Sequence, residues 1–116
     1  KATDLGGVKL VAHDAGDIDS ADDLRALALP ARDRMGSEAA VIAVTGVLGG
    51  KPVLLVATNQ GARDAGVKAG ALVRVGAKVL GGGGGGKDDL AQGGGQDASK
   101  VSEALAEVTR QVAERA

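Results

Sequence analysis

The alternation of apolar and polar positions along the chain predicts a mixture of strands and helices. Residues 8–13, 39–47 and 52–58 are apolar runs of strand length. The last two runs are separated by residues 48–51, which contain two glycines, and this spacing predicts a β-hairpin. Neither run alternates apolar with polar residues, so we expect both faces of their sheet to be covered.

The first helical pattern follows residues 14–20, an Asp- and Gly-rich segment that we interpret as a turn. Ser20 is the expected N-cap, because Asp23 follows it in the position of a capping box. Pro30 falls inside the helical pattern, where we expect it to bend or shorten the helix. Gly36 is expected to end the helix.

Two more helices are predicted in the second half of the chain. Residues 67–80 have an apolar stripe at helical spacing, and residues 98–115 have another, preceded by Asp97 as a plausible N-cap. Residues 89–93 are predicted to form a short strand between them. These elements predict one α/β domain spanning residues 1–116, a mixed β-sheet with helices packed on it and a Gly-rich loop between the last two helices.

The amino-acid composition excludes several classes of site and function. The chain contains no Phe, Tyr, Trp or Cys. Its core must therefore be aliphatic, and RNA recognition by stacking of bases on aromatic rings is excluded. The absence of Cys removes disulfides and thiolate metal sites. We expect neither a signal peptide nor a membrane partner, because no apolar run approaches the roughly 18 residues of a membrane helix.

No set of residues predicts catalysis or metal binding. His13 is the only histidine, and no Cys, Ser or second His stands at a recognisable spacing from it. The acidic turn with Asp14, Asp17 and Asp19 lacks the length and the terminal Glu of a calcium loop, so we interpret it as a helix-capping turn. We expect no catalytic residue, no metal site and no cofactor in this chain.

The distribution of charge indicates an anionic partner more clearly than the net charge of −1 does. Residues 60–87 carry five basic side chains and one acidic one, whereas residues 1–40 and 88–116 are both net acidic. The positive charge is concentrated just before and after a run of six glycines, residues 81–86. A local field of one sign steers anionic ligands even when the whole protein is nearly neutral.

The glycine run is followed by Lys87 and, after a short interval, by a second cluster at residues 93–95. The string G-x-x-x-x-G-K is satisfied, but Asp88 replaces the Ser or Thr of a phosphate loop, and the run follows a helix instead of a strand. We therefore do not predict a nucleotide phosphate loop. Two alternatives remain, a backbone-lined surface facing an anion or RNA and a flexible surface loop with solvated lysines.

Residues 53–105 closely resemble the C-terminal domain of bacterial alanyl-tRNA synthetase. The resemblance rests on the glycine run followed by a basic residue, an acidic residue, the pattern A-Q-x-G-G and a closing helix. Residues 35–51 fit the family more loosely. The resemblance is specific because both glycine clusters occur at the right spacing between helices of the right length.

This resemblance implies a non-catalytic module that binds the outer corner of tRNA. The parent enzyme would attach alanine to tRNA with ATP and Mg in the cytoplasm, and remove misattached serine or glycine in a separate Zn-containing editing domain. The expected partners are tRNA(Ala) and the rest of the synthetase chain, and the missing initiator Met is in keeping with a fragment. The candidate RNA-binding residues are Arg74, Lys78, Gly82, Gly83, Gly84, Gly85, Gly86, Lys87, Gln92, Gly93 and Gly94.

Two other functions stay open at this point. One is a homodimerisation module of the same enzyme, in which glycines allow close packing between chains. The other is a phosphodiester- or nucleotide-binding domain of a DHH-type phosphoesterase, although in that family the glycine run usually ends in His and here it ends in Lys87. If the glycines face RNA, replacing Gly83 and Gly84 with Val is expected to disrupt binding more than stability.

Overall fold

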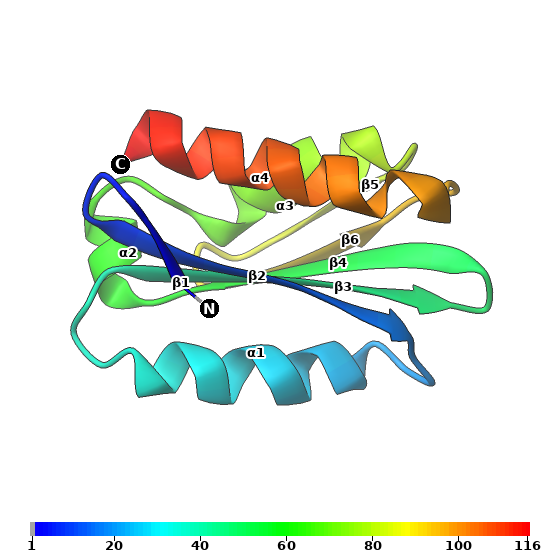
Figure 1. Cartoon of the computed structure of the whole chain (residues 1–116), viewed down its shortest axis with the longest axis horizontal. Coiled ribbons are helices and arrows are strands. Elements are labelled where there is room, and N and C mark those ends of the chain that lie inside the picture. Colours follow the sequence, from blue (N-terminus) through cyan, green and yellow to red (C-terminus); the bar gives the residue numbers. More distant parts are fainter. Residues whose placement is uncertain (1) are drawn as a thin grey trace.

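The computed structural model describes residues 2–116 and contains a six-stranded mixed sheet between two helical layers (Figure 1). The strand order is β1-β2-β3-β4-β6-β5, with β2 and β3 parallel and every other neighbouring pair antiparallel. The strands are β1 (Ala2–Leu5), β2 (Val8–Asp17), β3 (Ala40–Leu48), β4 (Lys51–Thr58), β5 (Gly83–Gly86) and β6 (Leu90–Gly94).

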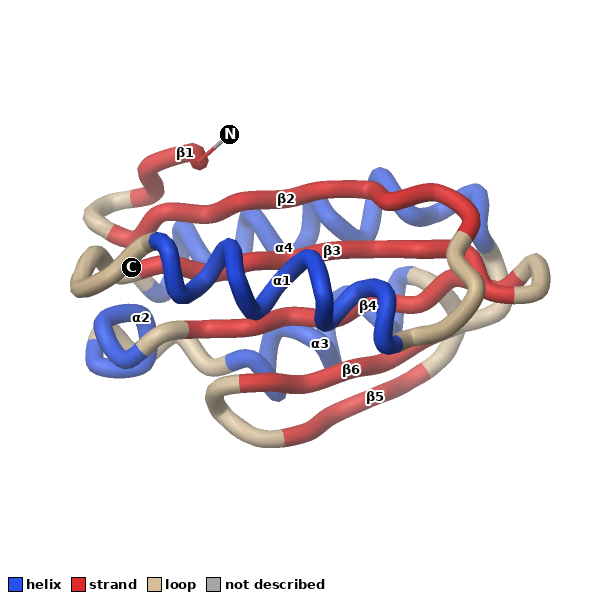
Figure 2. The backbone as a smooth tube through the Cα atoms, turned by 90° about the horizontal axis from the view of Figure 1, so that it is seen from below, coloured by secondary structure: helices blue, strands red, loops and turns tan. Residues whose placement is uncertain are grey.

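The helices divide between the two faces of the sheet. Helix α1 lies alone on one face, and α3 and α4 lie together on the other (Figures 1 and 2). The crossover from β2 to the parallel strand β3 passes through α1, as parallel pairing requires. The helical elements are α1 (Asp22–Arg34), α2 (Gln60–Asp64), α3 (Ala69–Val79), the 3₁₀ turn η1 (Ala98–Lys100) and α4 (Val101–Arg115).

The core consists of two apolar clusters, one on each side of the sheet. Leu54 and Val56 of β4 pack toward α3 and α4, whereas Leu55 and Ala57 of the same strand pack toward α1. All four side chains are fully buried. Because neighbouring strand residues point to opposite faces, this unbroken apolar run confirms the predicted coverage of both faces.

The start of α1 differs from the prediction. Strand β2 continues to Asp17 through most of the predicted turn. The N-cap is Ala21, which has no side-chain capping bond, so the expected Ser20 cap is wrong. Half of the capping box is nevertheless present, because the Asp23 carboxylate accepts hydrogen bonds from the backbone amides of Asp19 and Ser20 at 3.1 and 3.4 Å.

Gly36 and Asp97 are confirmed as terminal signals. Gly36 lies just beyond α1 with φ +62°, a left-handed conformation that glycine adopts without strain. Pro30, which was expected to bend or shorten the helix, lies inside α1 and does not shorten it, because α1 continues to Arg34. Asp97 caps η1, where its carboxylate accepts from the Ser99 amide at 3.0 Å. Hydrogen bonds from the Ser99 hydroxyl and then its amide lower the pKa of Asp97.

The glycine run is a strand, not the predicted loop. Gly83–Gly86 form β5, the outermost strand of the sheet, which pairs only with β6. An added Cβ at Gly84 would lie 2.3 Å from the Cα atom of Gly93 and 2.9 Å from a methyl group of Val73 in α3. The glycines therefore permit close packing of β5 against its own neighbours, which favours a larger effect of Gly84→Val on stability than expected from the sequence.

Gly84→Val is predicted to lower the melting temperature by about 5 °C or more, because overpacking of this kind typically costs about 1–3 kcal/mol. Gly83→Val is the matched control, since an added Cβ there meets no atom within 4 Å. It should leave the melting temperature nearly unchanged, because Val suits an exposed strand position. Equal losses in both variants would contradict the distinction between the two glycines.

Candidate nucleic-acid interface

Hydrogen bonds join the turn between β5 and β6 to the ends of β4 and α3. The carbonyl oxygen of Asp88 accepts hydrogen bonds from the Thr58 hydroxyl at 2.6 Å and from the Ala69 amide, in the first turn of α3, at 2.8 Å. The Thr58 amide donates to the carbonyl of Asp89 at 3.0 Å. Thr58 is fully buried. The position of Lys87, next to this turn, is therefore set by the ends of β4 and α3.

At the open end of the β5–β6 hairpin, opposite the turn, backbone atoms pack closely against one another and against the end of α3. An added Cβ at Gly82 would lie 2.1 Å from the carbonyl oxygen of Gly94. At Gly95 it would lie 2.1 Å from the carbonyl oxygen of Leu80, the residue after α3. The amides of Gln96 and Asp97 donate to the same Leu80 carbonyl at 2.9 and 3.1 Å. Glycines at this end are required by the fold itself.

The candidate glycines thus separate into two groups. An added Cβ would approach backbone atoms within 3.0 Å at Gly82, Gly84, Gly86, Gly93 and Gly94. By contrast, Gly83 faces open space, and the nearest atom to a Cβ at Gly85 is Nη1 of Arg74 at 4.0 Å. This alternation follows from the period of two along a strand, and it leaves one side of β5 uncovered.

The outer edge of β5 also presents backbone donors. The Lys87 amide donates to the carbonyl of Leu90 at 3.0 Å, which makes this a hydrogen-bonded pair of the antiparallel ladder. Such pairs alternate with non-bonded ones along the ladder, so the amides of Gly84 and Gly86 point away from β6. The edge therefore offers backbone N–H groups without side chains to shield them.

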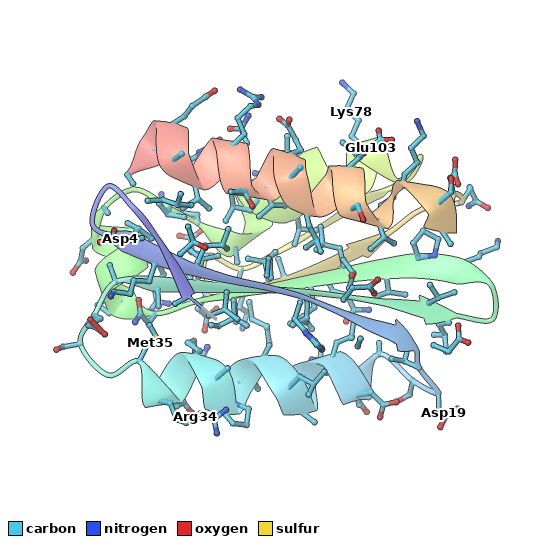
Figure 3. All side chains as sticks on the ribbon, in the orientation of Figure 1. Asp4, Asp19, Arg34, Met35, Lys78 and Glu103 are labelled. Carbon is cyan, nitrogen blue, oxygen red and sulfur yellow. The ribbon has the colours of Figure 1, made fainter. Side chains whose placement is uncertain are left out.

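The three predicted basic residues do not gather at one point. Arg74, on the exposed side of α3, reaches the outer edge of β5 near Gly85. Lys87 lies at the turn of the hairpin. Lys78 points away from the sheet on the outer surface of the α3 and α4 layer (Figure 3). The structure thus brings Arg74 and the glycine strand together and places Lys78 elsewhere.

A cavity lies on the opposite face of the sheet, beside α1. Helix α1 packs over β3 and β4 and leaves β6 and β5 uncovered on this face (Figure 2). The resulting cavity of about 400 Å³, which we call the sheet trough, includes Gly85 and Gly86 of the candidate set. Its other lining residues include Arg25, Leu55, Lys87, Asp89, Leu90 and Gln92.

Sequence reasoning missed Arg25. It belongs to α1, far along the chain from the glycines, and no local pattern distinguishes it from other helical arginines. Its guanidinium Nη1 lies 3.3 Å from a carboxylate oxygen of Asp22, one helical turn earlier. Half of the Arg25 side chain remains exposed. Only the packing of α1 across the sheet brings it to the same cavity as Lys87.

Among residues 2–116, no group of three or more His, Cys, Asp or Glu side chains is placed to hold a metal ion. Within the same residues, none of the helices has the length and apolar character needed to cross a membrane.

Comparison with known proteins identifies the family. The DHHA1 domain model matches residues 7–114. Alanine–tRNA ligase of Paenarthrobacter aurescens is 64% identical over 114 residues, covering 98% of this chain and 13% of that protein. The enzyme of Streptomyces avermitilis is 51% identical over 116 residues, covering 99% of this chain and 13% of that protein. The chain therefore spans about an eighth of the length of these relatives.

Solved structures agree with this assignment. The C-Ala domain of Aquifex aeolicus alanyl-tRNA synthetase is 30% identical, with a TM-score of 0.86 over 97% of this chain and 98% of that one. A DHH domain described as a member of the s1p family of ribosomal proteins has a TM-score of 0.72 at 15% identity, and covers 98% of this chain and 28% of its own. The second similarity shows the fold alone. The chain therefore belongs to the DHHA1 family, as a C-Ala domain of alanyl-tRNA synthetase.

Proposed function

We propose that this domain is a non-catalytic tRNA-binding module of alanine–tRNA ligase. It holds tRNA(Ala) so that the aminoacylation and editing sites elsewhere in the enzyme act on the same molecule. The observation that supports this most directly is the glycine strand β5 at the free edge of the sheet, with Arg74 beside it. The relatives named as alanine–tRNA ligases support the same assignment.

The chemistry of this edge suits an RNA backbone. The outward amides of Gly84 and Gly86 can donate to phosphate or ribose oxygens, and the missing side chains let RNA approach the strand closely. Arg74 and Lys87 add phosphate contacts at the edge and at the turn. Contacts of this kind position an RNA without reading its sequence, and their strength falls with salt.

Modest affinity is sufficient for this role. A binding surface tethered to another RNA-binding part of the same enzyme acts at a high effective concentration. We assign ATP, Mg and Zn to those other parts, where alanine activation and editing would take place. This role places the domain in the cytoplasm, together with the rest of the synthetase chain.

A second function, homodimerisation, is favoured by one specific observation. The outer edge of β5 is free, its strand is largely exposed, and no charged side chain on the strand itself blocks pairing with another strand. Edges of this type are able to pair with a second chain. Pairing of β5 with β5 would cover the amides proposed to contact RNA, so a dimer formed in this way should dissociate when tRNA binds.

Arg74→Gln and Lys87→Gln are each predicted to weaken tRNA(Ala) binding and to reduce the slope of log affinity against log salt by about 1. Lys78→Gln should have a smaller effect, because Lys78 points away from the sheet. Fluorescence anisotropy at several salt concentrations measures both quantities. Lys9→Gln is the control, since Lys9 lies on β2 and pairs with Glu38 at 3.6 Å. An equal loss in Lys9→Gln, or no binding of the native domain at low salt, would refute the proposal.

The proposal also requires that the turn beside Lys87 be held in place. Thr58→Val removes the hydroxyl that donates to Asp88 while keeping the shape of the side chain. We expect a loss of about 1 kcal/mol in stability and a weaker complex with tRNA(Ala). Thr58→Ser keeps the hydroxyl and should restore much of both. Thermal melting and anisotropy provide the two readouts, and native-like behaviour of Thr58→Val would show that the anchor is unimportant.

A further inference from the structure

The sheet trough has features that a phosphate contact alone does not require. Its volume of about 400 Å³ falls within the range of roughly 300–1,000 Å³ that is typical of small-ligand pockets. The half-buried side chain of Leu90 gives it an apolar wall, beneath which Leu55 is fully buried. A phosphate group is small and strongly hydrated and gains nothing from apolar contact, whereas a planar nucleobase has faces that such a wall can cover.

We propose that the sheet trough binds one unpaired base of the RNA, with the guanidinium of Arg25 as its stacking surface. This inference rests on the proposed tRNA-binding function and adds a base contact to the edge contacts. Splayed-out bases in RNA complexes stack on aromatic side chains or on arginine guanidinium planes. The chain has no aromatic residue, and Arg25 is the arginine that lines the trough.

The backbone of Arg25 is held firmly in place, while its side chain stays free to turn. The neighbouring Leu24 and, one turn later, Ala28 are fully buried against the sheet and fix α1 over β3 and β4. Asp22 holds one nitrogen of the guanidinium in an exposed ion pair, a weak interaction that leaves the faces of the group available. The side chain can therefore turn its plane toward a base without losing a buried partner.

Two polar side chains in the trough can read the edge of a base. The amide of Gln92 both donates and accepts hydrogen bonds, whereas the carboxylate of Asp89 accepts only. A carboxylate repels phosphate but accepts from the amino groups of adenine, cytosine or guanine. Lys87, also in the lining, supplies the positive charge for the phosphate of the same nucleotide. The trough therefore offers both hydrogen-bond donors and acceptors to the edge of a base.

Arg25→Lys tests the stacking contact, because it keeps the charge and removes the plane. Binding of a tRNA(Ala) transcript, followed by anisotropy at several salt concentrations, should weaken about fivefold or more. The salt slope should stay unchanged, whereas Lys87→Gln should lower it by about 1. Arg34→Lys is the matched control, since Arg34 lies on the same helix and points away from the sheet (Figure 3).

The outcomes separate the two proposals. If the native domain binds tRNA(Ala) and Arg25→Lys binds equally well, the base site is refuted and the tRNA-binding function stands. If Arg25→Lys weakens binding and lowers the salt slope, Arg25 contacts phosphate and the base site is again refuted. If the native domain does not bind tRNA(Ala) at low salt, both proposals fall together.

A second pair of variants tests the role of Asp89. Asp88 is its neighbour in the turn and does not line the trough, so Asp88→Asn reports the general effect of removing one negative charge. That variant should bind tRNA(Ala) slightly more tightly. Asp89→Asn should bind severalfold more weakly than Asp88→Asn, because the carboxylate that accepts from the base is lost. Equal tightening in both variants would show that Asp89 only repels RNA.

Discussion

The close approach of two glycine clusters is the constraint on which this end of the fold depends. Strands β5 and β6 and helix α3 meet so tightly that an added Cβ at Gly84 would lie 2.3 Å from the Cα atom of Gly93. Similar backbone contacts join Gly82 to Gly94 within the hairpin and Gly95 to Leu80 at the end of α3. The edge of the sheet can be completed only by a strand that lacks side chains on its inner side, because any larger residue would displace α3 or β6.

This constraint also gives the edge its chemistry. A strand alternates its two sides, so the inner glycines Gly84 and Gly86 are required by packing while Gly83 and Gly85 face outward. The same strand exposes backbone amides along its free edge, with Arg74 beside it and Lys87 at the turn. The glycines of β5 therefore serve both packing and the proposed contact with RNA. Only substitutions at single glycines can separate the two roles.

Much of the fold could be predicted from the sequence. The apolar runs of β3 and β4, the hairpin between them and the helices α3 and α4 follow from local periodicity and turn residues. The glycine run could not be interpreted in this way. Glycine has the lowest strand and helix propensity short of proline, so local reasoning favoured a loop, and only tertiary packing makes it a strand. The short edge strand β1 and helix α2 were not predicted either, because each is too short to show a clear periodic pattern in the sequence.

The candidate site was only partly accessible to sequence reasoning. Lys87, Gln92 and the glycines lie close together in the chain, and their resemblance to alanyl-tRNA synthetase made them candidates. No local sequence pattern marks Arg25 or Thr58. The role of Arg25 depends on the position of α1 across the sheet, and the role of Thr58 depends on the position of the turn between β5 and β6. Lys78 shows the converse, since its nearness in the chain to the glycine run made it a candidate, yet its side chain points away from the sheet.

The central claim is that the exposed backbone of β5 contacts tRNA, and a backbone amide spectrum tests it most directly. In a titration of the ¹⁵N-labelled domain with tRNA(Ala), monitored by two-dimensional NMR, the account predicts that the amide signals of Gly84 and Gly86 shift or broaden first. Amides of β1, at the opposite edge of the sheet, should stay unchanged. Binding that perturbs β1 and leaves the β5 glycines untouched would contradict the account.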